Sequence, residues 1–192
     1  MRGGDDQRDR RSRGALAGMV VTIVLLLGGL WLANRLELFI PSWVSWQKTS
    51  AAVDLDRDGR EERIELANGR CCVEDASGAV LYKTPGDWHI TRVATGDVDL
   101  DGANDLLMLT WRRGNYGTSR PFWDTSVDFR MTEHLYVFEM REGRLVPKWM
   151  SHELGAPVTD IAATDEGTVT LTTTDGARTT WRWEGFGFTL TR

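Results

Sequence analysis

Cysteine is scarce in this chain of 192 residues, which has only two, at the adjacent positions Cys71 and Cys72. Two cysteines cannot make a disulfide framework, so the class of small disulfide-built folds is excluded. Neighbouring side chains on a strand point to opposite faces, so we expect one thiol in the core and the other exposed to solvent or to a second chain. Hydrophobic residues make up 41% of the sequence and charged residues 27%, which is typical of a globular protein and excludes general disorder.

The sequence also lacks the local motifs of the common catalytic classes. No nucleophile elbow, phosphate-binding loop, HExxH motif or Ser-His-Asp pattern stands out. His89, His134 and His152 are isolated from one another in the sequence, in or beside predicted strands, which suits packing or surface roles better than metal ligation. We therefore expect a protein that is not an enzyme, with a glycosidase built on paired acids as the weaker alternative.

Positive charge is in short supply beyond the N-terminus. Residues 36–192 hold 17 Lys and Arg against 25 Asp and Glu, a net charge of −8, whereas residues 1–14 hold five Arg against three Asp. Nucleic-acid binding needs a basic face that neutralises phosphates. The acidic balance therefore excludes nucleic acid from the expected partners.

One long uncharged run lies near the N-terminus, the 19 residues ALAGMVVTIVLLLGGLWLA at 15–33. A helix of this length nearly spans the ~30 Å hydrocarbon core of a bilayer. A cleaved signal peptide is the alternative, but its apolar region is usually shorter, and cleavage after Ala33 would put bulky Trp31 at the −3 position. We therefore predict an uncleaved signal anchor and a single-pass membrane protein.

The distribution of arginine predicts the orientation of this anchor, because cytoplasmic flanks are enriched in Lys and Arg. We expect residues 1–14 to form a cytoplasmic basic tail and residues 15–34 to be the transmembrane signal anchor. A juxtamembrane linker would follow at 35–48, and residues 49–192 would form an extracytoplasmic domain. The expected location is the cell membrane, with the N-terminus in the cytoplasm.

Beyond residue 49 the hydrophobic pattern is that of short strands separated by turns such as Asn68-Gly69 and Glu142-Gly143. The predicted fold is all-β, with three four-stranded antiparallel meanders, partially β-propeller-like, after one N-terminal transmembrane helix. The expected strands lie at 48–53, 62–66, 70–74 and 79–83, then 88–95, 105–111, 133–140 and 144–150, then 157–164, 168–173, 178–184 and 187–191.

Two copies of the pattern D-x-D-x-D-G-x-x-[DE] follow the first strands of the first and second meanders. Crowded carboxylates repel one another, and Ca²⁺, which takes 6–8 oxygen ligands, removes that cost. We predict calcium ligands from carboxylates at positions 1, 3, 5 and 9 and from a backbone carbonyl at position 7. These are Asp54, Asp56, Asp58, Arg60 (carbonyl) and Glu62 in the first copy, and Asp97, Asp99, Asp101, Ala103 (carbonyl) and Asp105 in the second.

The first copy also satisfies the EF-hand pattern, with Glu65 at position 12. An EF-hand needs a helix on each side of its loop, whereas both flanks here alternate like strands. The second copy has Met108 where a bidentate acid should stand. We therefore exclude an EF-hand pair. The third meander keeps only Asp165 and Gly167 of the acidic pattern.

With strands on both sides, the pattern resembles the FG-GAP (VCBS-type) repeats of integrin α-subunit propellers and of many bacterial surface proteins. The resemblance covers about residues 50–191 and depends on the two acidic loops, while Gly155-Ala156-Pro157 and Phe186-Gly187 match the family's other marks only in part. It implies four-stranded blades, each with a calcium loop between its first and second strands. Propellers usually close with 4–8 blades, so three blades would form an open fragment, a homo-oligomer or part of a complex with another chain.

A long connection at 111–132 interrupts the second meander and is rich in aromatic and arginine side chains. Loops of this length are often functional. Its candidate partner-binding residues, suited to a protein or glycan, are Trp111, Tyr116, Arg120, Phe122 and Trp123. The alternative is that these aromatics fill the open side of an incomplete propeller.

Together these features predict a membrane-anchored, extracytoplasmic, calcium-binding FG-GAP-like module for binding or adhesion at the cell surface. The alternative is a non-catalytic scaffold subunit of a larger envelope complex, completed by dimerisation or by a partner chain through unpaired strand edges.

Overall fold

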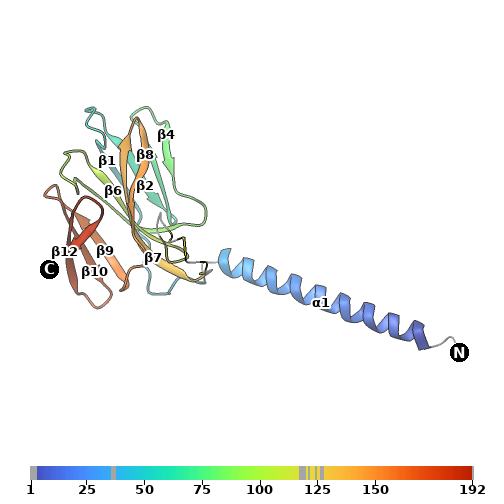
Figure 1. The fold of residues 1–192 in the computed structure, drawn as a ribbon. Coiled ribbons are helices and arrows are strands. Elements are labelled where there is room, and N and C mark those ends of the chain that lie inside the picture. The colour runs from blue at the N-terminus through green and yellow to red at the C-terminus, as the bar shows by residue number, and fades with distance from the viewer. Residues whose placement is uncertain are drawn as a thin grey trace. The chain divides into compact units, whose positions relative to one another are not determined.

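The computed structural model describes residues 4–35, 38–116, 120, 122–123, 125 and 128–191. The chain divides into two compact units, Met1–Pro41 and Ser42–Arg192. Among the described residues, the first unit contains one helix, and the second, which we call the β domain, contains twelve strands (Figure 1).

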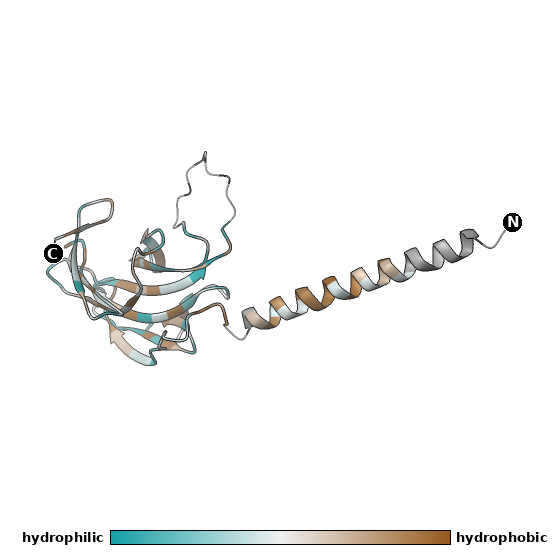
Figure 2. Cartoon of the chain, turned by 90° about the horizontal axis from the view of Figure 1, so that it is seen from below, coloured by the Kyte–Doolittle hydropathy of each residue, from teal (hydrophilic) through white to brown (hydrophobic). Residues whose placement is uncertain are grey.

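Helix α1 runs from Gly4 to Arg35. Its segment Gly14–Ala33 is long and apolar enough to cross a membrane, and the side chains of this segment are not buried within the chain. Figure 2 shows the brown hydrophobic residues of this segment. The helix therefore has the length and composition of a membrane anchor or of a signal sequence.

The strands form three separate four-stranded antiparallel sheets, and in each sheet the strands neighbour one another in sequence order. The first sheet contains β1 (Thr49–Val53), β2 (Glu62–Ala67), β3 (Arg70–Glu74) and β4 (Val80–Lys83). The second contains β5 (His89–Gly96), β6 (Asp105–Arg113), β7 (Met131–Arg141) and β8 (Arg144–Met150). The third contains β9 (Val158–Ala163), β10 (Thr168–Thr173), β11 (Arg178–Trp183) and β12 (Phe188–Leu190). The prediction of three four-stranded meanders is confirmed.

Two-residue hairpins explain why the strand boundaries were readable from the sequence. Asn68 and Gly69 join β2 to β3 with φ of 52° and 70°, and Glu142 and Gly143 join β7 to β8 with φ of 52° and 71°. Positive φ at both central residues is the backbone of a type I′ turn, which matches the twist of paired strands. Glycine at the second position adopts this conformation without strain.

The second sheet is buried on both faces. Strand β6 has seven consecutive buried residues, and successive side chains go to different cores: Leu106 and Met108 join the first sheet's side chains, whereas Leu107 and Leu109 join those of the third. A strand covered on both sides has no polar face, which accounts for its continuous apolar run. The three sheets therefore pack as a stack with the second sheet in the middle.

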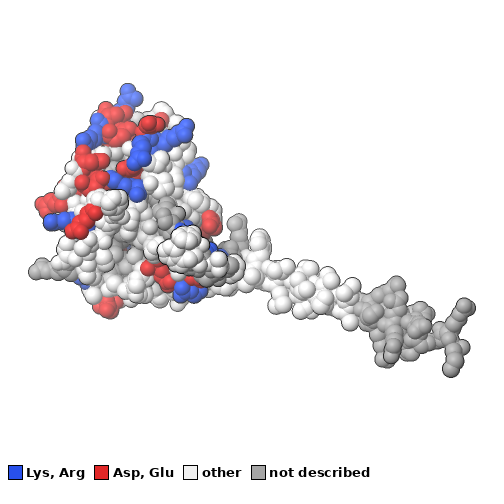
Figure 3. Space-filling model, in the orientation of Figure 1, with Lys and Arg blue, Asp and Glu red and all other residues white. Residues whose placement is uncertain are grey.

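The two outer faces of this stack are polar. On the first sheet, Arg63 is exposed and pairs with Glu65 at 3.2 Å and with Glu74 at 3.0 Å. By strand register, the outer face of the third sheet carries Asp160, Ala162, Thr168, Thr170, Thr172, Arg178, Thr180, Arg182 and Thr189. On the side seen in Figure 3, acidic and basic side chains are interspersed over the β domain. Neither outer sheet face among these strands presents a continuous apolar surface.

The C-terminal part of the predicted linker belongs to the β domain. Gln47 N–H donates to Thr91 O at 3.1 Å, and Gln47 Oε1 accepts from Val93 N–H at 3.0 Å. Trp43 packs edge-on against Trp111 with ring centroids 5.9 Å apart. These bonds tie the segment from Ser42 onward to β5 and β6, so the compact unit starts before the first strand.

Candidate metal-binding loops

The two acidic loops connect the first and second strands of their sheets, as the sequence predicts. The first acidic loop, residues 54–61, joins β1 to β2, and the second, residues 97–104, joins β5 to β6. Both are flanked by strands, which agrees with the exclusion of an EF-hand. Glu65, the position-12 acid of that pattern, lies on the outer face of β2 and pairs with Arg63 at 3.2 Å.

The loops share one backbone conformation. Arg57 and Leu100, at position 4 of each copy, have φ of 63° and 61°, and Gly59 and Gly102, at position 6, have φ of 82° and 83°. Positive φ is uncommon for residues other than glycine, so its recurrence at equivalent positions is not expected by chance. The repeated sequence pattern therefore corresponds to a repeated structure.

Matching hydrogen bonds hold each loop closed. Three backbone hydrogen bonds occur in both copies. The N–H at position 6 donates to the acid at position 1, and the N–H at position 7 donates to the acid at position 5. The N–H at position 2 donates to the acid at position 9. The pairs are Gly59 to Asp54 (3.0 Å) and Gly102 to Asp97 (2.6 Å), Arg60 to Asp58 (2.7 Å) and Ala103 to Asp101 (2.8 Å), and Leu55 to Glu62 (2.8 Å) and Val98 to Asp105 (3.2 Å). Asp54 also accepts the Arg57 N–H with its other oxygen, and the other oxygen of Asp105 accepts from Lys148 Nζ. The carbonyls of Arg60 and Ala103 stay predicted ligands.

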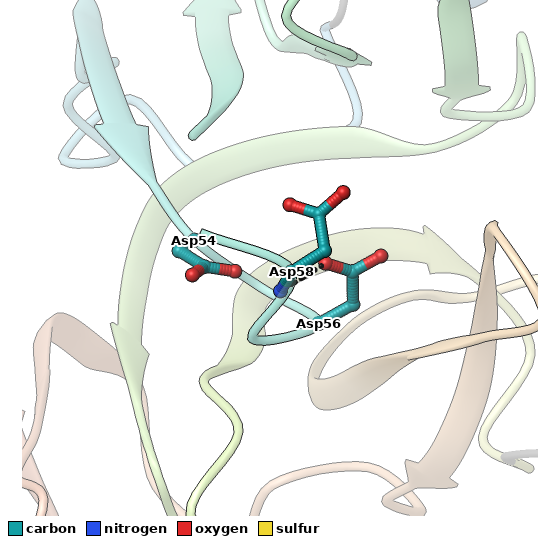
Figure 4. A group of neighbouring side chains, drawn as sticks. All are labelled: Asp54, Asp56 and Asp58. Atoms are coloured by element: carbon teal, nitrogen blue, oxygen red, sulfur yellow. Dashed lines mark hydrogen bonds between the residues drawn. The ribbon is translucent and has the colours of Figure 1, made fainter. Parts of the chain in front are cut away.

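In the first acidic loop, oxygens of Asp54, Asp56 and Asp58 lie within 4.8 Å of one another (Figure 4). Asp54 is half-buried, and the other two are exposed. Asp56, Asp58 and the nearly buried Glu62 also line a pocket of about 240 Å³. Burial raises the pKa of Glu62, and the negative charges of the three aspartates raise it further. A cation at this point would relieve that repulsion.

At the second acidic loop the converging acids are Asp97 and Asp99 of the loop and Asp105 at the start of β6, whose oxygens also lie within 4.8 Å of one another. Oδ1 of Asp97 and Oδ1 of Asp99 are buried and have no hydrogen-bond partner. Such oxygens are costly unless a proton donor or a metal ion satisfies them, and hard cations such as Ca²⁺ prefer oxygen ligands. The fourth predicted ligand, Asp101, lies outside this group and pairs with Arg57 at 3.7 Å.

Lys148, on β8, is a residue of this site that the sequence does not predict. Its Nζ lies 2.6 Å from Asp99 Oδ2, 2.9 Å from Asp105 Oδ1 and 3.6 Å from Glu139 Oε2. Burial raises the pKa of Asp105 to about 6, although the hydrogen bond and charge of Lys148 lower it. Lys148 is distant in sequence and belongs to no recognisable motif, so only strand pairing reveals this contact.

The loops also contact one another. Asn104 Nδ2 of the second acidic loop donates to Asp54 O of the first at 3.0 Å. The Arg57 guanidinium lies where a side chain on Gly102 would be, and Leu100 packs in the same way on Gly167 of the connection between β9 and β10. The position-4 side chain of each acidic loop thus contacts a glycine of the next loop, which places the three loops in a row.

The predicted long loop of the second sheet is shorter than expected, because β6 extends to Arg113 and β7 begins at Met131. Trp111 therefore lies within β6 and is buried, with its Nε1–H donating to Glu133 Oε1 at 2.9 Å. The prediction that it presents its side chain on a loop was wrong, because the strand pairing continues past it.

The other four partner-binding candidates lie in the loop. Tyr116 packs edge-on against His152, with ring centroids 5.4 Å apart, and Arg120 lies 5.6 Å from the centre of its ring. Phe122 and Trp123 are 91% and 72% exposed, and their rings pack edge-on with centroids 4.9 Å apart. Such exposure contradicts the alternative that this aromatic pair fills an opening in the sheet stack.

The arrangement can hold hard cations in two matching loops and can present an aromatic pair to a partner. Comparison of the chain with protein-family models, with curated proteins and with solved structures found no match.

Proposed function

We propose that the chain is a membrane-anchored binding module whose β domain is stabilised by calcium at its acidic loops. The observation that carries this proposal is the duplicated loop, which has positive φ at the same two positions and three matching backbone hydrogen bonds in each copy. Three carboxylates converge in each copy, at positions 1, 3 and 5 of the first and at positions 1, 3 and 9 of the second. This placement between first and second strands is also the one that FG-GAP (VCBS-type) repeats use, which supports a resemblance to that family. Because a bound ligand stabilises the folded state, calcium outside the cell would maintain the loops.

The partner surface that we propose is the exposed pair of Phe122 and Trp123. Aromatic rings supply contact area for protein hot spots and for sugar rings at small entropic cost. The pair is exposed on a loop, where it is available to a protein or glycan at the cell surface. An extracytoplasmic position of the β domain, with α1 as an uncleaved anchor, completes the proposal.

The polar outer faces of the sheet stack disfavour one form of the scaffold alternative, in which another chain packs a further sheet on the stack rather than adding a strand at an edge. A further sheet packed on the stack would need an apolar face to cover, and the outer faces carry charges and threonines instead.

The test is urea unfolding of the full chain in neutral detergent, followed by tryptophan fluorescence with and without calcium. At a calcium concentration 100 times the Kd of the first acidic loop, we expect binding at this loop to raise the free energy of unfolding by about 2.7 kcal/mol. The double variant Asp56→Asn/Asp58→Asn keeps the acceptors of the loop's backbone hydrogen bonds but removes two charges, so most of this gain should disappear. Asp165→Asn, in the third loop, is the matched control and should keep it.

Absence of any shift at millimolar calcium, or the full gain in the double variant, would contradict the proposal.

A further inference from the structure

We propose that Lys148 is an internal cation that competes with calcium for the second acidic loop, so that the first loop fills at lower calcium concentration than the second. This inference rests on the proposed calcium binding and concerns its regulation. Its basis is the position of one ammonium group among three carboxylates.

The ammonium group is built into the site. The Lys148 side chain is 9% exposed, and its partners Asp105 and Asp99 are 2% and 18% exposed. Nζ has three protons to donate, and the carboxylates of Asp99, Asp105 and Glu139 surround it within 3.6 Å. An ion pair this deeply placed is screened much less by salt than a surface pair.

An irregularity in the backbone of β8 directs the Lys148 side chain toward the second acidic loop. In the pairing of β7 with β8, Val137 faces Trp149 and Phe138 faces Pro147, which leaves Lys148 as the extra residue of a β-bulge. Bulges of this kind re-aim a side chain relative to the regular alternation of the strand. The local irregularity of the sheet thus coincides with the residue that reaches the acids.

Lys148 occupies some of the oxygens that a calcium ion would use. Asp105 has both oxygens engaged, one by Val98 N–H and the other by Lys148, and Asp99 Oδ2 is engaged by Lys148 as well. Oδ1 of Asp97 and Oδ1 of Asp99 are left without a partner. A divalent ion bound there would lie near a positive charge, and their repulsion lowers its affinity.

The first acidic loop has no equivalent cation among the described residues. The carboxylates of Asp54, Asp56 and Asp58 accept hydrogen bonds from backbone N–H groups of their own loop. The loop has two basic side chains. Arg57 extends to Asp101 of the second loop. Arg60 borders the pocket that Asp56 and Asp58 line but forms no ion pair with an acid of this loop in the part of the chain that the structure describes. The two loops therefore have the same backbone conformation but differ in the charge next to the calcium ion that each would bind.

The test is equilibrium dialysis of radioactive calcium against the full chain in neutral detergent. For the wild type we expect one ion per chain at low calcium and a second only at concentrations about tenfold higher or more. Lys148→Met keeps a side chain of similar size without charge and should tighten the weaker site by about tenfold or more. Lys83→Met, an exposed lysine of β4, is the matched control and should change neither site.

Asp56→Asn/Asp58→Asn should abolish the tighter site and leave the weaker one. If the tighter site survives in this double variant, or if Lys148→Met folds and leaves the weaker site unchanged, the inference is wrong. The double variant tests which loop fills first even where Lys148→Met does not fold. Two equal sites in the wild type would also overturn the inference while supporting calcium binding, whereas no bound calcium at all would overturn the proposed function itself.

Discussion

The buried carboxyl group of Glu133 gives the β domain a predicted dependence of stability on pH. Glu133 is 4% exposed on β7, where Oε1 accepts from Trp111 Nε1–H at 2.9 Å and Oε2 accepts from Val158 N–H at 2.8 Å. Burial raises the pKa of Glu133 from 4.5 to about 7, although these two bonds and the charge of Arg92 lower it. The group thus connects the second sheet to the first residue of β9 at the cost of desolvation.

The sign of the pH effect follows from this raised pKa. Between pH 4.5 and about 7 the folded state binds a proton at Glu133 that the unfolded state has released, so stability falls as the pH rises through this window. At 1.36 kcal/mol for each pKa unit, the contribution of Glu133 that is full below pH 4.5 and lost above pH 7 amounts to about 3 kcal/mol. Glu133→Gln removes this titrating group while it keeps the shape of the side chain.

The assay is urea unfolding of the wild type and of Glu133→Gln at pH 5, 6, 7 and 8, at one saturating calcium concentration. The difference in free energy of unfolding between the two chains should shrink by up to about 3 kcal/mol from the lowest to the highest pH, because the contributions of all other groups cancel. Glu166→Gln, exposed in the third loop, serves as control and should follow the wild type. Parallel profiles of the wild type and Glu133→Gln would refute the reasoning.

Two further predictions concern the loops. Gly102→Ala places a methyl group at φ of 83° and against the Arg57 guanidinium, so it should lower the free energy of unfolding by about 1–2 kcal/mol or more in urea titrations, whereas Gly86→Ala, which has open space, should not. Phe122→Ser/Trp123→Ser should leave the urea midpoint unchanged and abolish binding on glycan arrays or to cell-surface proteins; unchanged binding would remove this pair from the partner surface.

The strands and loops that could be predicted from the sequence are those that depend on local chemistry. Asn68-Gly69 and Glu142-Gly143 form the hairpins that their residue types favour, and the two acidic patterns form one repeated loop. Residue spacing also placed both loops between first and second strands. In each case the information lies within a dozen or so neighbouring residues.

The parts that could not be predicted depend on contacts between distant segments. Asp101 fits the ligand pattern as well as Asp99 does, but its carboxylate lies near Arg57 of the other loop instead. Lys148 reaches the second acidic loop through a β-bulge that no sequence motif signals. Trp111 was expected on a loop. The aromatic and arginine residues that follow it are compatible both with a loop and with a continuing strand, so the sequence does not show where the strand ends.

The polar outer faces of the three-sheet stack have a consequence for how such a chain can lengthen. A ring of sheets stops growing when its last sheet meets its first, so its size is fixed by closure. In this stack, the number of sheets depends on the side chains of the two outer sheets. Arg63 on one outer face and Arg182 on the other are exposed to water, so neither face favours the packing of a further sheet. Of the three sheets described, the middle one is apolar on both faces. A longer relative would arise by duplication of this middle unit, with the two end sheets kept as caps.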